Sequence, residues 1–175
     1  TPKPCRASAF FGERVALSGS RLLVSASSQH FSDEGANAAY VFERDTTGQW
    51  RQTARLTGEP GRQEGLFAAG IDLDGDRAVV STSGNPEGDY GGAVYVYDYD
   101  SATDTWSRSA HLTARQGVEA GVLGRNVALD GNRLAVAAST YFEYQPGAVY
   151  VFKREASTGT WRRGDPHHPP GRRNE

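Results

Sequence analysis

The sequence contains no methionine, one cysteine and no large excess of either charge. With Cys5 alone, an internal disulfide framework and a cysteine metal site are excluded, and a free thiol or an intermolecular bridge remain as alternatives. A formal net charge of −2 provides no field to attract nucleic acid or anionic lipid. No apolar stretch approaches the roughly 20 residues of a membrane span. Because Met is absent and Thr1 comes first, we expect a processed or excised segment.

The motifs of common enzyme classes are also missing. The sequence shows no nucleophile with a base, no paired acidic residues, and no glycine-rich phosphate loop between a strand and a helix. Apolar residues at i, i+3, i+4 and i+7 with helix caps are absent as well. We therefore predict an all-β protein that is not an enzyme.

What the sequence does contain is one strand-like stretch that occurs three times. Ala39–Phe42 returns as Val94–Tyr97 and as Val149–Phe152, at intervals of about 55 residues. Asp74-Gly75 and Asp130-Gly131 lie between apolar runs, where Asp-Gly favours the type I′ turn of a two-residue hairpin. A repeat with such turns predicts short antiparallel strands.

Each repeat is predicted to contain four strands, which in the first repeat span residues 13–18, 21–26, 37–44 and 50–57. The second and third strands are apolar on both faces, so both faces of the sheet need cover. Radial stacking of such sheets gives a β-propeller, in which each four-stranded sheet is one blade. The predicted organisation is an N-terminal arm at 1–9, blade 1 at 10–64, blade 2 at 65–120, blade 3 at 121–163 with a fourth strand truncated by prolines, and a disordered polar tail at 164–175.

Several segments resemble a known repeat. Phe11-Gly12, Arg21–Ala26 and Ala39–Phe42 look like successive parts of an FG-GAP repeat, the blade unit of the integrin α-subunit head and of many bacterial extracellular proteins. Gly147–Phe152 reads G-A-V-Y-V-F, as in the bacterial variant. The resemblance covers about residues 10–163 and implies a propeller, commonly of seven blades, in an extracellular or cell-surface protein.

Three blades cannot close a ring, since natural propellers have at least about four. Three alternatives follow for this partial propeller. The chain is a fragment of a longer one, or it pairs with a copy of itself to form a six-bladed ring with twofold symmetry. Otherwise it is an open arc whose ends are buried by another protein. In each case we expect the apolar end faces to be covered.

The resemblance also implies a calcium site, because relatives hold calcium in an aspartate-rich loop of the first hairpin. The nearest match is Asp72, Asp74 and Asp76. Strand alternation puts Asp72 on the same face as Asp74. However, this hairpin is short for an ion that takes six or more oxygens, and Asp74-Gly75 is alternatively a simple tight turn. We therefore expect no cofactor, with calcium as the alternative.

The loops between the second and third strands do not repeat, whereas the strands do. Repeat proteins vary the loops on their binding face, and exposed Tyr and Phe anchor protein interfaces. The alternative is loop drift without a partner. The candidate binding residues in these loops are Phe31, Asp89, Tyr90, Tyr141, Phe142 and Tyr144.

The expected function is a non-enzymatic extracellular module for binding, adhesion or structural assembly. It would recognise a protein partner through the variable loops or the open blade edges. One alternative is a lectin-like propeller that binds carbohydrate, in which Trp50, Trp106 and Trp161 would stack on sugars instead of covering the blade cores. A second alternative is an accessory propeller of a larger secreted enzyme.

Overall fold

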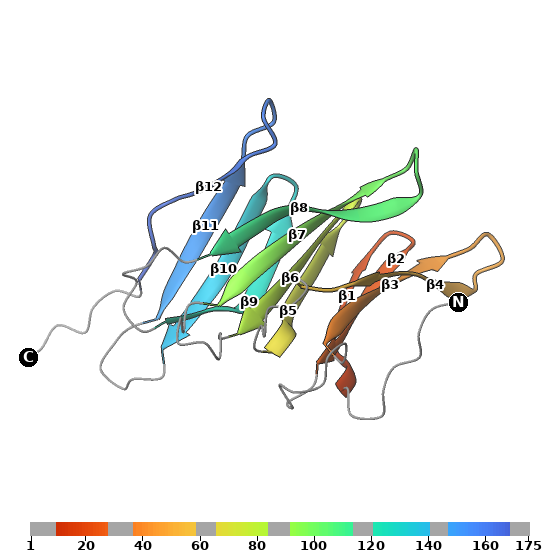
Figure 1. The fold of residues 1–175 in the computed structure, drawn as a ribbon, viewed down its shortest axis with the longest axis horizontal. Coiled ribbons are helices and arrows are strands. Elements are labelled where there is room, and N and C mark those ends of the chain that lie inside the picture. Colours follow the sequence, from red (N-terminus) through yellow and green to blue (C-terminus); the bar gives the residue numbers. More distant parts are fainter. Residues whose placement is uncertain are drawn as a thin grey trace, which may run out of the picture.

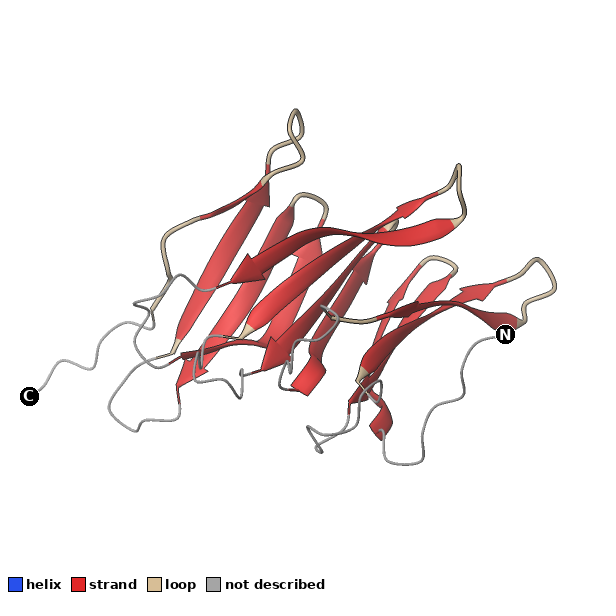
Figure 2. Cartoon of the chain, viewed as in Figure 1, coloured by secondary structure: helices blue, strands red, loops and turns tan. Residues whose placement is uncertain are grey.

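The computed structural model describes residues 10–27, 37–58, 66–83, 92–113, 121–140 and 147–168. These residues form three four-stranded antiparallel sheets that lie side by side, one for each repeat (Figure 1). Figure 2 shows that the described residues contain strands and turns but no helix. None of the described segments is therefore a helix of the length and apolarity needed to cross a membrane.

The strands follow the chain within each sheet, so that neighbours in sequence are neighbours in space. Blade 1 consists of β1 (Phe10–Ser18), β2 (Arg21–Ser27), β3 (Ala38–Arg44) and β4 (Trp50–Leu56). Blade 2 consists of β5 (Leu66–Asp74), β6 (Arg77–Ser83), β7 (Ala93–Asp100) and β8 (Thr105–Thr113). Blade 3 consists of β9 (Gly121–Asp130), β10 (Arg133–Thr140), β11 (Ala148–Arg154) and β12 (Trp161–Arg163).

The three sheets share one register, which confirms the predicted repeat. The tyrosine of each repeated stretch pairs with a valine of the second strand, as Val24–Tyr40, Val80–Tyr95 and Val136–Tyr150. The first strand of each blade also has a bulge or irregularity at the corresponding place. All-β propeller blades are thus confirmed, in a row that does not close into a ring.

The hydrophobic core lies between the sheets. One cluster joins blade 1 to blade 2 and includes Leu23 and Val41 from the first and Phe67 and Tyr95 from the second. The next cluster joins blades 2 and 3 through residues such as Val96 and Leu134. Each sheet therefore has a leading face, toward the preceding blade, and a trailing face, toward the following one.

The first hairpin of each blade differs in turn type from the prediction. Asp74 and Asp130 are the last residues of their strands, and the two-residue loops are Gly75-Asp76 and Gly131-Asn132. The glycines have positive φ angles of 55° and 53°, whereas the residues after them do not. Positive φ at the first central position alone fits a type II′ turn and not type I′. Consequently the Asp74 side chain belongs to a strand.

The predicted disordered tail needs a correction at its start. β12 is short, as the prolines predicted, but the Gly164 N–H donates to the Val151 carbonyl at 2.8 Å. His167 then exchanges two backbone hydrogen bonds with Val149, at 2.8 and 2.9 Å. Pro166 lacks an N–H, but His167 after it regains a donor, so pairing with β11 resumes. The part of the tail beyond residue 168 lies outside the described residues.

Candidate functional site

The segments with the predicted binding residues all attach at one edge of the molecule, which we call the loop-bearing edge. The start of β1 and the end of β4 lie there too, because Phe10 pairs with Ser27 and Ala39 with Leu56. The strand pairs that flank these segments are Ala26–Ala38, Thr82–Ala93 and Ala138–Ala148. The predicted binding residues themselves lie outside the described residues: Phe31, Asp89, Tyr90, Tyr141, Phe142 and Tyr144.

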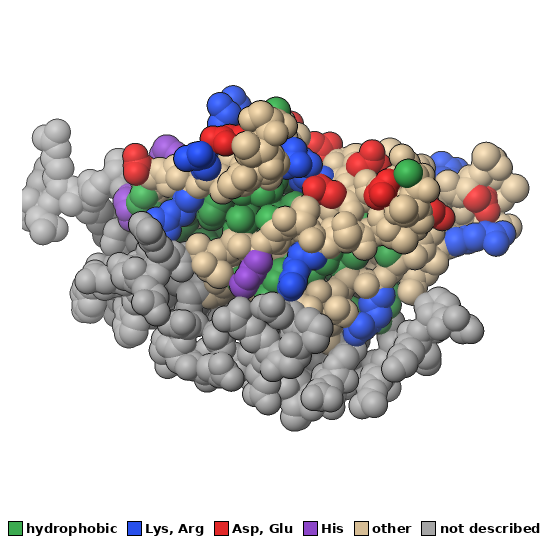
Figure 3. Space-filling view, turned by 45° about the horizontal axis from the view of Figure 1, so that its top comes forward, with side chains coloured by type: hydrophobic (Ala, Val, Ile, Leu, Met, Phe, Trp, Pro, Cys, Tyr) green, Lys and Arg blue, Asp and Glu red, His purple; other side chains and the backbone are tan. Residues whose placement is uncertain are grey.

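The opposite edge holds the first and third hairpin turns, and there successive blades are joined by polar contacts. The Gly75 N–H donates to Ser18 Oγ of blade 1 at 2.9 Å, and the Gly131 N–H donates to Asp74 Oδ2 of blade 2 at 2.7 Å. Figure 3 shows acidic and basic side chains interspersed along this turn-bearing edge. In blades 1 and 2 the last residue of the first strand thus accepts a hydrogen bond from the next blade.

An arginine at the start of the second strand makes the complementary contact. Arg21 Nη1 donates to the Gly75 carbonyl at 3.3 Å, and Arg77 Nη1 donates to the Gly131 carbonyl at 3.0 Å. Within its own blade, Arg21 Nε pairs with Glu43 at 2.7 Å and Arg77 Nε with Asp98 at 2.6 Å. We use the name turn contact for the two interactions that a blade makes with the turn of the next blade: the one made by this arginine, and the one made by the acceptor before the turn, Ser18 or Asp74.

Aromatic rings of the next blade complete the turn contact. The Arg21 guanidinium carbon lies 4.0 Å from the Tyr99 ring centroid and 5.6 Å from that of Trp106. Arg77 lies 5.7 Å from the Trp161 ring. Burial lowers the pKa of Arg21, but hydrogen bonds to Glu43 and Asp76 outweigh it and raise that pKa above its ordinary value. The guanidinium is therefore a fixed positive charge between two blades.

The three aspartates suggested as calcium ligands take part in these contacts. Asp72 Oδ2 accepts the Leu129 N–H at 2.6 Å, so Asp72 and Asp74 both face blade 3, as alternation predicted. Asp76 instead pairs with Arg21 of blade 1. The three carboxylates point toward different blades and do not converge on one ion. Among the described residues, no group of three or more Asp, Glu, His or Cys is placed to hold a metal.

The leading face of blade 1 is open, unlike that of blade 2. Leu17 is 65 % exposed, whereas its counterpart Leu73 is 5 % exposed beneath blade 1. Trp50 is 41 % exposed, whereas Trp161 at the same position in blade 3 is 9 % exposed. The exposed large apolar residues of blade 1 are Phe10, Phe11, Val15, Leu17 and Trp50. The expectation that each tryptophan covers a core therefore fails for Trp50.

The trailing face of blade 3 is more polar than those of blades 1 and 2. Ala135, Val149 and Val151 keep its centre apolar. Beyond the end of β12, His167 pairs with Val149 where Leu112 pairs with Val94 in blade 2. Lys153 pairs with Arg133 where Glu43 and Asp98 pair with Arg21 and Arg77. The two ends of the row thus differ in character.

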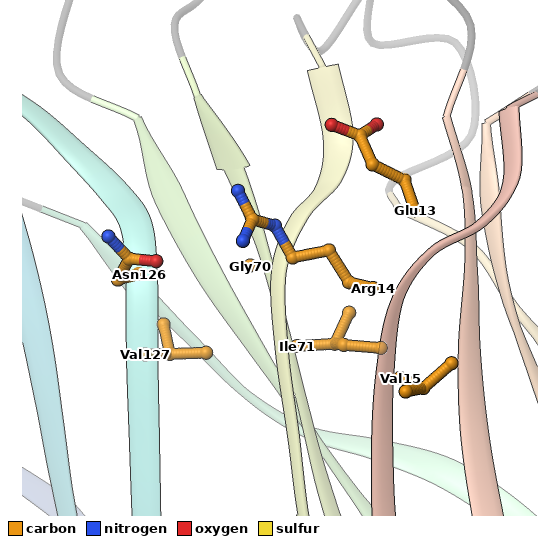
Figure 4. A pocket seen from close by; sticks show the side chains of 7 residues that line it. All are labelled: Glu13, Arg14, Val15, Gly70, Ile71, Asn126 and Val127. Carbon is orange, nitrogen blue, oxygen red and sulfur yellow. The ribbon is translucent and has the colours of Figure 1, made fainter.

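A hollow of about 330 Å³ lies on the innermost strands, where β1, β5 and β9 run next to one another (Figure 4). The Arg14 side chain extends from β1 toward Gly70, and its Nε donates to the Ala69 carbonyl at 2.9 Å. Asn126 projects into the hollow from β9. Its lining offers hydrogen-bonding groups and one acid, Glu13, but no nucleophile with a base.

The second-strand arginine recurs in the sequence as Arg21, Arg77 and Arg133, but its role between blades was not predicted. The available signal was the position of this arginine, which directly follows a tight turn in all three repeats. An arginine that only faced solvent would not need to recur at one position. The inner hollow had no such signal, because its polar lining differs from blade to blade: Arg14, Gly70 and Asn126 precede the equivalent residues Val15, Ile71 and Val127.

The sequence matches the model of a known protein family. The family described as FG-GAP repeat matches at residues 1–42, 50–97 and 106–152. Each match ends with the third strand of a blade, and the second and third matches begin in the fourth strand of the preceding blade. No curated protein matches the chain. Domains of this repeat are typically non-catalytic and are typically extracellular or surface-associated.

Proposed function

Because the chain belongs to the FG-GAP repeat family, whose repeats generally form propeller modules for protein interaction, we propose that it is a non-enzymatic binding or scaffolding module. We also propose an extracellular or cell-surface location, where FG-GAP repeats typically occur. The partner is a protein, bound at the loop-bearing edge. The single observation that carries this proposal is that three loops of unrelated sequence attach side by side to three blades of one register.

Physical reasoning supports this edge as the recognition surface. The strand sequences of the three blades are similar because each sheet must pack against its neighbours, and this packing constrains the residues of the core. The loops carry no such constraint, so their composition is available for recognition. Aromatic side chains beside acidic ones are suited to a protein surface that offers apolar pockets with basic residues around them.

The test replaces Tyr141, Phe142 and Tyr144 with alanine in the full chain. The matched control is Thr103→Ala, in the β7–β8 turn at the opposite edge. Partners are identified from a panel of purified extracellular proteins by surface plasmon resonance. Each aromatic anchor is worth about tenfold or more in affinity, so the triple variant should lose most of its binding while Thr103→Ala keeps it.

Three outcomes of this experiment are informative. Loss of binding with an unchanged thermal midpoint supports the loop-bearing edge. Unchanged binding by the triple variant contradicts it. A glycan array run in parallel with the same proteins distinguishes a lectin, because glycan binding without any protein partner would replace the proposal by carbohydrate recognition.

A further inference from the structure

We propose that the leading face of blade 1 binds the trailing face of blade 3 from a second copy of this chain, in a head-to-tail joint. The inference rests on the proposed scaffolding role but uses a different surface from the loop-bearing edge. Within the chain, each joint pairs a trailing face with the next leading face through an apolar centre and a turn contact. The two end faces are the remaining halves of such a joint.

The leading half of the joint is present on blade 1. Its apolar centre includes Leu17, at the position where Leu73 is covered in blade 2. At its turn-bearing edge is a hollow of about 490 Å³, lined by the first turn, Gly19-Ser20, and by the 44–48 turn. In blade 2 the space between the corresponding turns receives the guanidinium of Arg21. Blade 1 therefore has a hollow at the corresponding place, with Arg44 in its lining and the exposed Trp50 paired with Arg44 beside it.

The trailing half of the joint is present on blade 3. Asp130 and Arg133 occupy the positions of Asp74 and Arg77 on either side of the turn. Both side chains are exposed, and neither has a hydrogen-bond or ion-pair partner within the described ranges. On β11 Arg133 lies opposite Lys153 instead of an acid, and although Asp130 lies opposite it on β9, no ion pair joins these two described side chains.

The two halves match in their turn backbone and their tryptophan, whereas Ser20 and Arg44 of blade 1 stand where blade 2 has Asp76 and Tyr99. By analogy with the internal joints, Arg133 of one copy would donate to the Gly19 carbonyl of the second copy and lie near its Trp50. Asp130 would accept the Gly19 N–H, as Asp74 accepts that of Gly131. Two such joints, related by a twofold axis, close two rows of three blades into a six-bladed ring.

A further departure, on blade 3, makes this joint weaker than the internal ones. Beyond the end of β12, His167 pairs with Val149 where blade 2 has Leu112, and Asp165 lies two residues before His167 as Ala110 lies two before Leu112. Ala110 and Leu112 pack against the core between blades 2 and 3. Two polar side chains at this rim reduce the apolar area that the joint buries. Restoring the apolar residues should therefore strengthen a head-to-tail joint, whereas a contact between two leading faces would be unaffected.

The experiment measures mass by sedimentation equilibrium of the full chain from about 1 to about 100 μM, the range that reports micromolar association. The variants are Leu17→Asp on the leading face, Arg133→Glu on the trailing face, and Asp165→Ala with His167→Leu. All four changed residues are exposed, so folding should be retained. Arg125→Glu, at an exposed position of β9 outside the turn contact, is the matched control.

The wild type should form a dimer that Leu17→Asp and Arg133→Glu each weaken about tenfold or more, as expected for loss of an interface anchor or charge contact. Asp165→Ala with His167→Leu should tighten it, and Arg125→Glu should leave it unchanged. A mixture of Leu17→Asp and Arg133→Glu should associate better than either alone, because one intact joint forms between them.

A wild type that stays monomeric throughout this range overturns the proposal. So does a dimer that Arg133→Glu leaves unchanged, since that result means two leading faces meet. Either failure is separate from the failure of the proposed function, because binding at the loop-bearing edge is measured on another surface with the Tyr141, Phe142 and Tyr144 variant.

Discussion

The leading faces of blades 1 and 2 have similar sequences and opposite environments. Phe11 is 50 % exposed, whereas Phe67 at the same position is 2 % exposed. Phe67 packs beneath blade 1, while Phe11 contacts the Tyr40 and Phe42 rings of its own sheet, with centroids 5.9 and 6.2 Å away. The comparison teaches that apolar residues on this face mark a joint, and that burial depends on whether a preceding blade is present.

The largest expected effect contrasts these two phenylalanines. Phe67→Ala should lower the free energy of unfolding by about 3–5 kcal/mol, because it empties a closed core between two blades. Phe11→Ala should lower it by only about 1 kcal/mol, because the ring is half exposed and makes edge contacts alone. Urea denaturation of both variants at low protein concentration measures the difference. Equal losses would mean that the leading face of blade 1 is as well covered as that of blade 2.

The next largest effect contrasts two glycines that occupy equivalent positions in the first strands of blades 1 and 3. Gly12 and Gly124 have φ angles of 88° and 97°, and a Cβ on Gly124 would lie 2.8 Å from Ser81 Cβ of blade 2. A Cβ on Gly12 would meet nothing within 4 Å. Gly124→Ala should therefore cost about 2–4 kcal/mol through strain and overpacking. Gly12→Ala should cost about 1 kcal/mol, from backbone strain alone.

Thermal or urea unfolding of the two glycine variants provides the measurement. If Gly12→Ala is as damaging as Gly124→Ala, a neighbour packs against blade 1 at this point, and the contrast between the two leading faces fails.

A smaller effect contrasts the arginines of the turn contact. Arg21→Ala should lower the free energy of unfolding by about 1–3 kcal/mol, because it removes charged hydrogen bonds and the Tyr99 stacking contact. Arg133→Ala should have almost no effect on the monomer, since it removes no such contact within the described residues. Urea denaturation at low concentration separates them. A comparable loss for Arg133→Ala would show that blade 3 already has a partner for it within the chain.

The smallest effect concerns Asp45, which lines the hollow on blade 1. The Thr47 hydroxyl, and then the Gln49 backbone N–H, lower the pKa of Asp45 from 3.8 to about 2. Because the folded pKa lies below the unfolded one, the stabilisation is complete above about pH 4 and is lost as the pH falls toward 2. Asp45→Asn should thus be less stable than the wild type at neutral pH, and the difference should fade near pH 2.

Urea midpoints at several pH values measure this effect, and Thr47→Ala is the companion variant because it removes the largest cause of the shift. A difference between Asp45→Asn and the wild type that does not change with pH would show that the carboxylate charge is not what stabilises this turn.

Much of the fold could be predicted from the sequence, because its causes are local and repeated. The tyrosine period fixes three sheets, and glycines at turn positions fix the hairpins. The turn type was missed because Asp74-Gly75 is equally compatible with two placements, and the next blade selects one by hydrogen bonding the Asp74 side chain. That hydrogen bond joins residues 57 positions apart in the sequence, and a local sequence pattern cannot predict a contact between residues so far apart.

The candidate sites were harder to predict for the same reason. Asp72, Asp74 and Asp76 looked like a ligand set because they alternate in sequence, but blades on both sides draw their carboxylates apart. Trp50 looked like Trp161, and only the position of a blade within the row separates them. Environment from neighbouring blades, and not residue type, decides these roles.

Hydrogen exchange of β1 as a function of protein concentration tests the central claim most directly, with β5 in the same sample as the reference. If the leading face of blade 1 is an open joint, β1 amides exchange faster than those of β5 in dilute solution. They should slow toward the β5 rates at high concentration in the wild type but not in Leu17→Asp. Exchange from β1 that is as slow as from β5 at every concentration would contradict the account, because it would mean that this face is already covered.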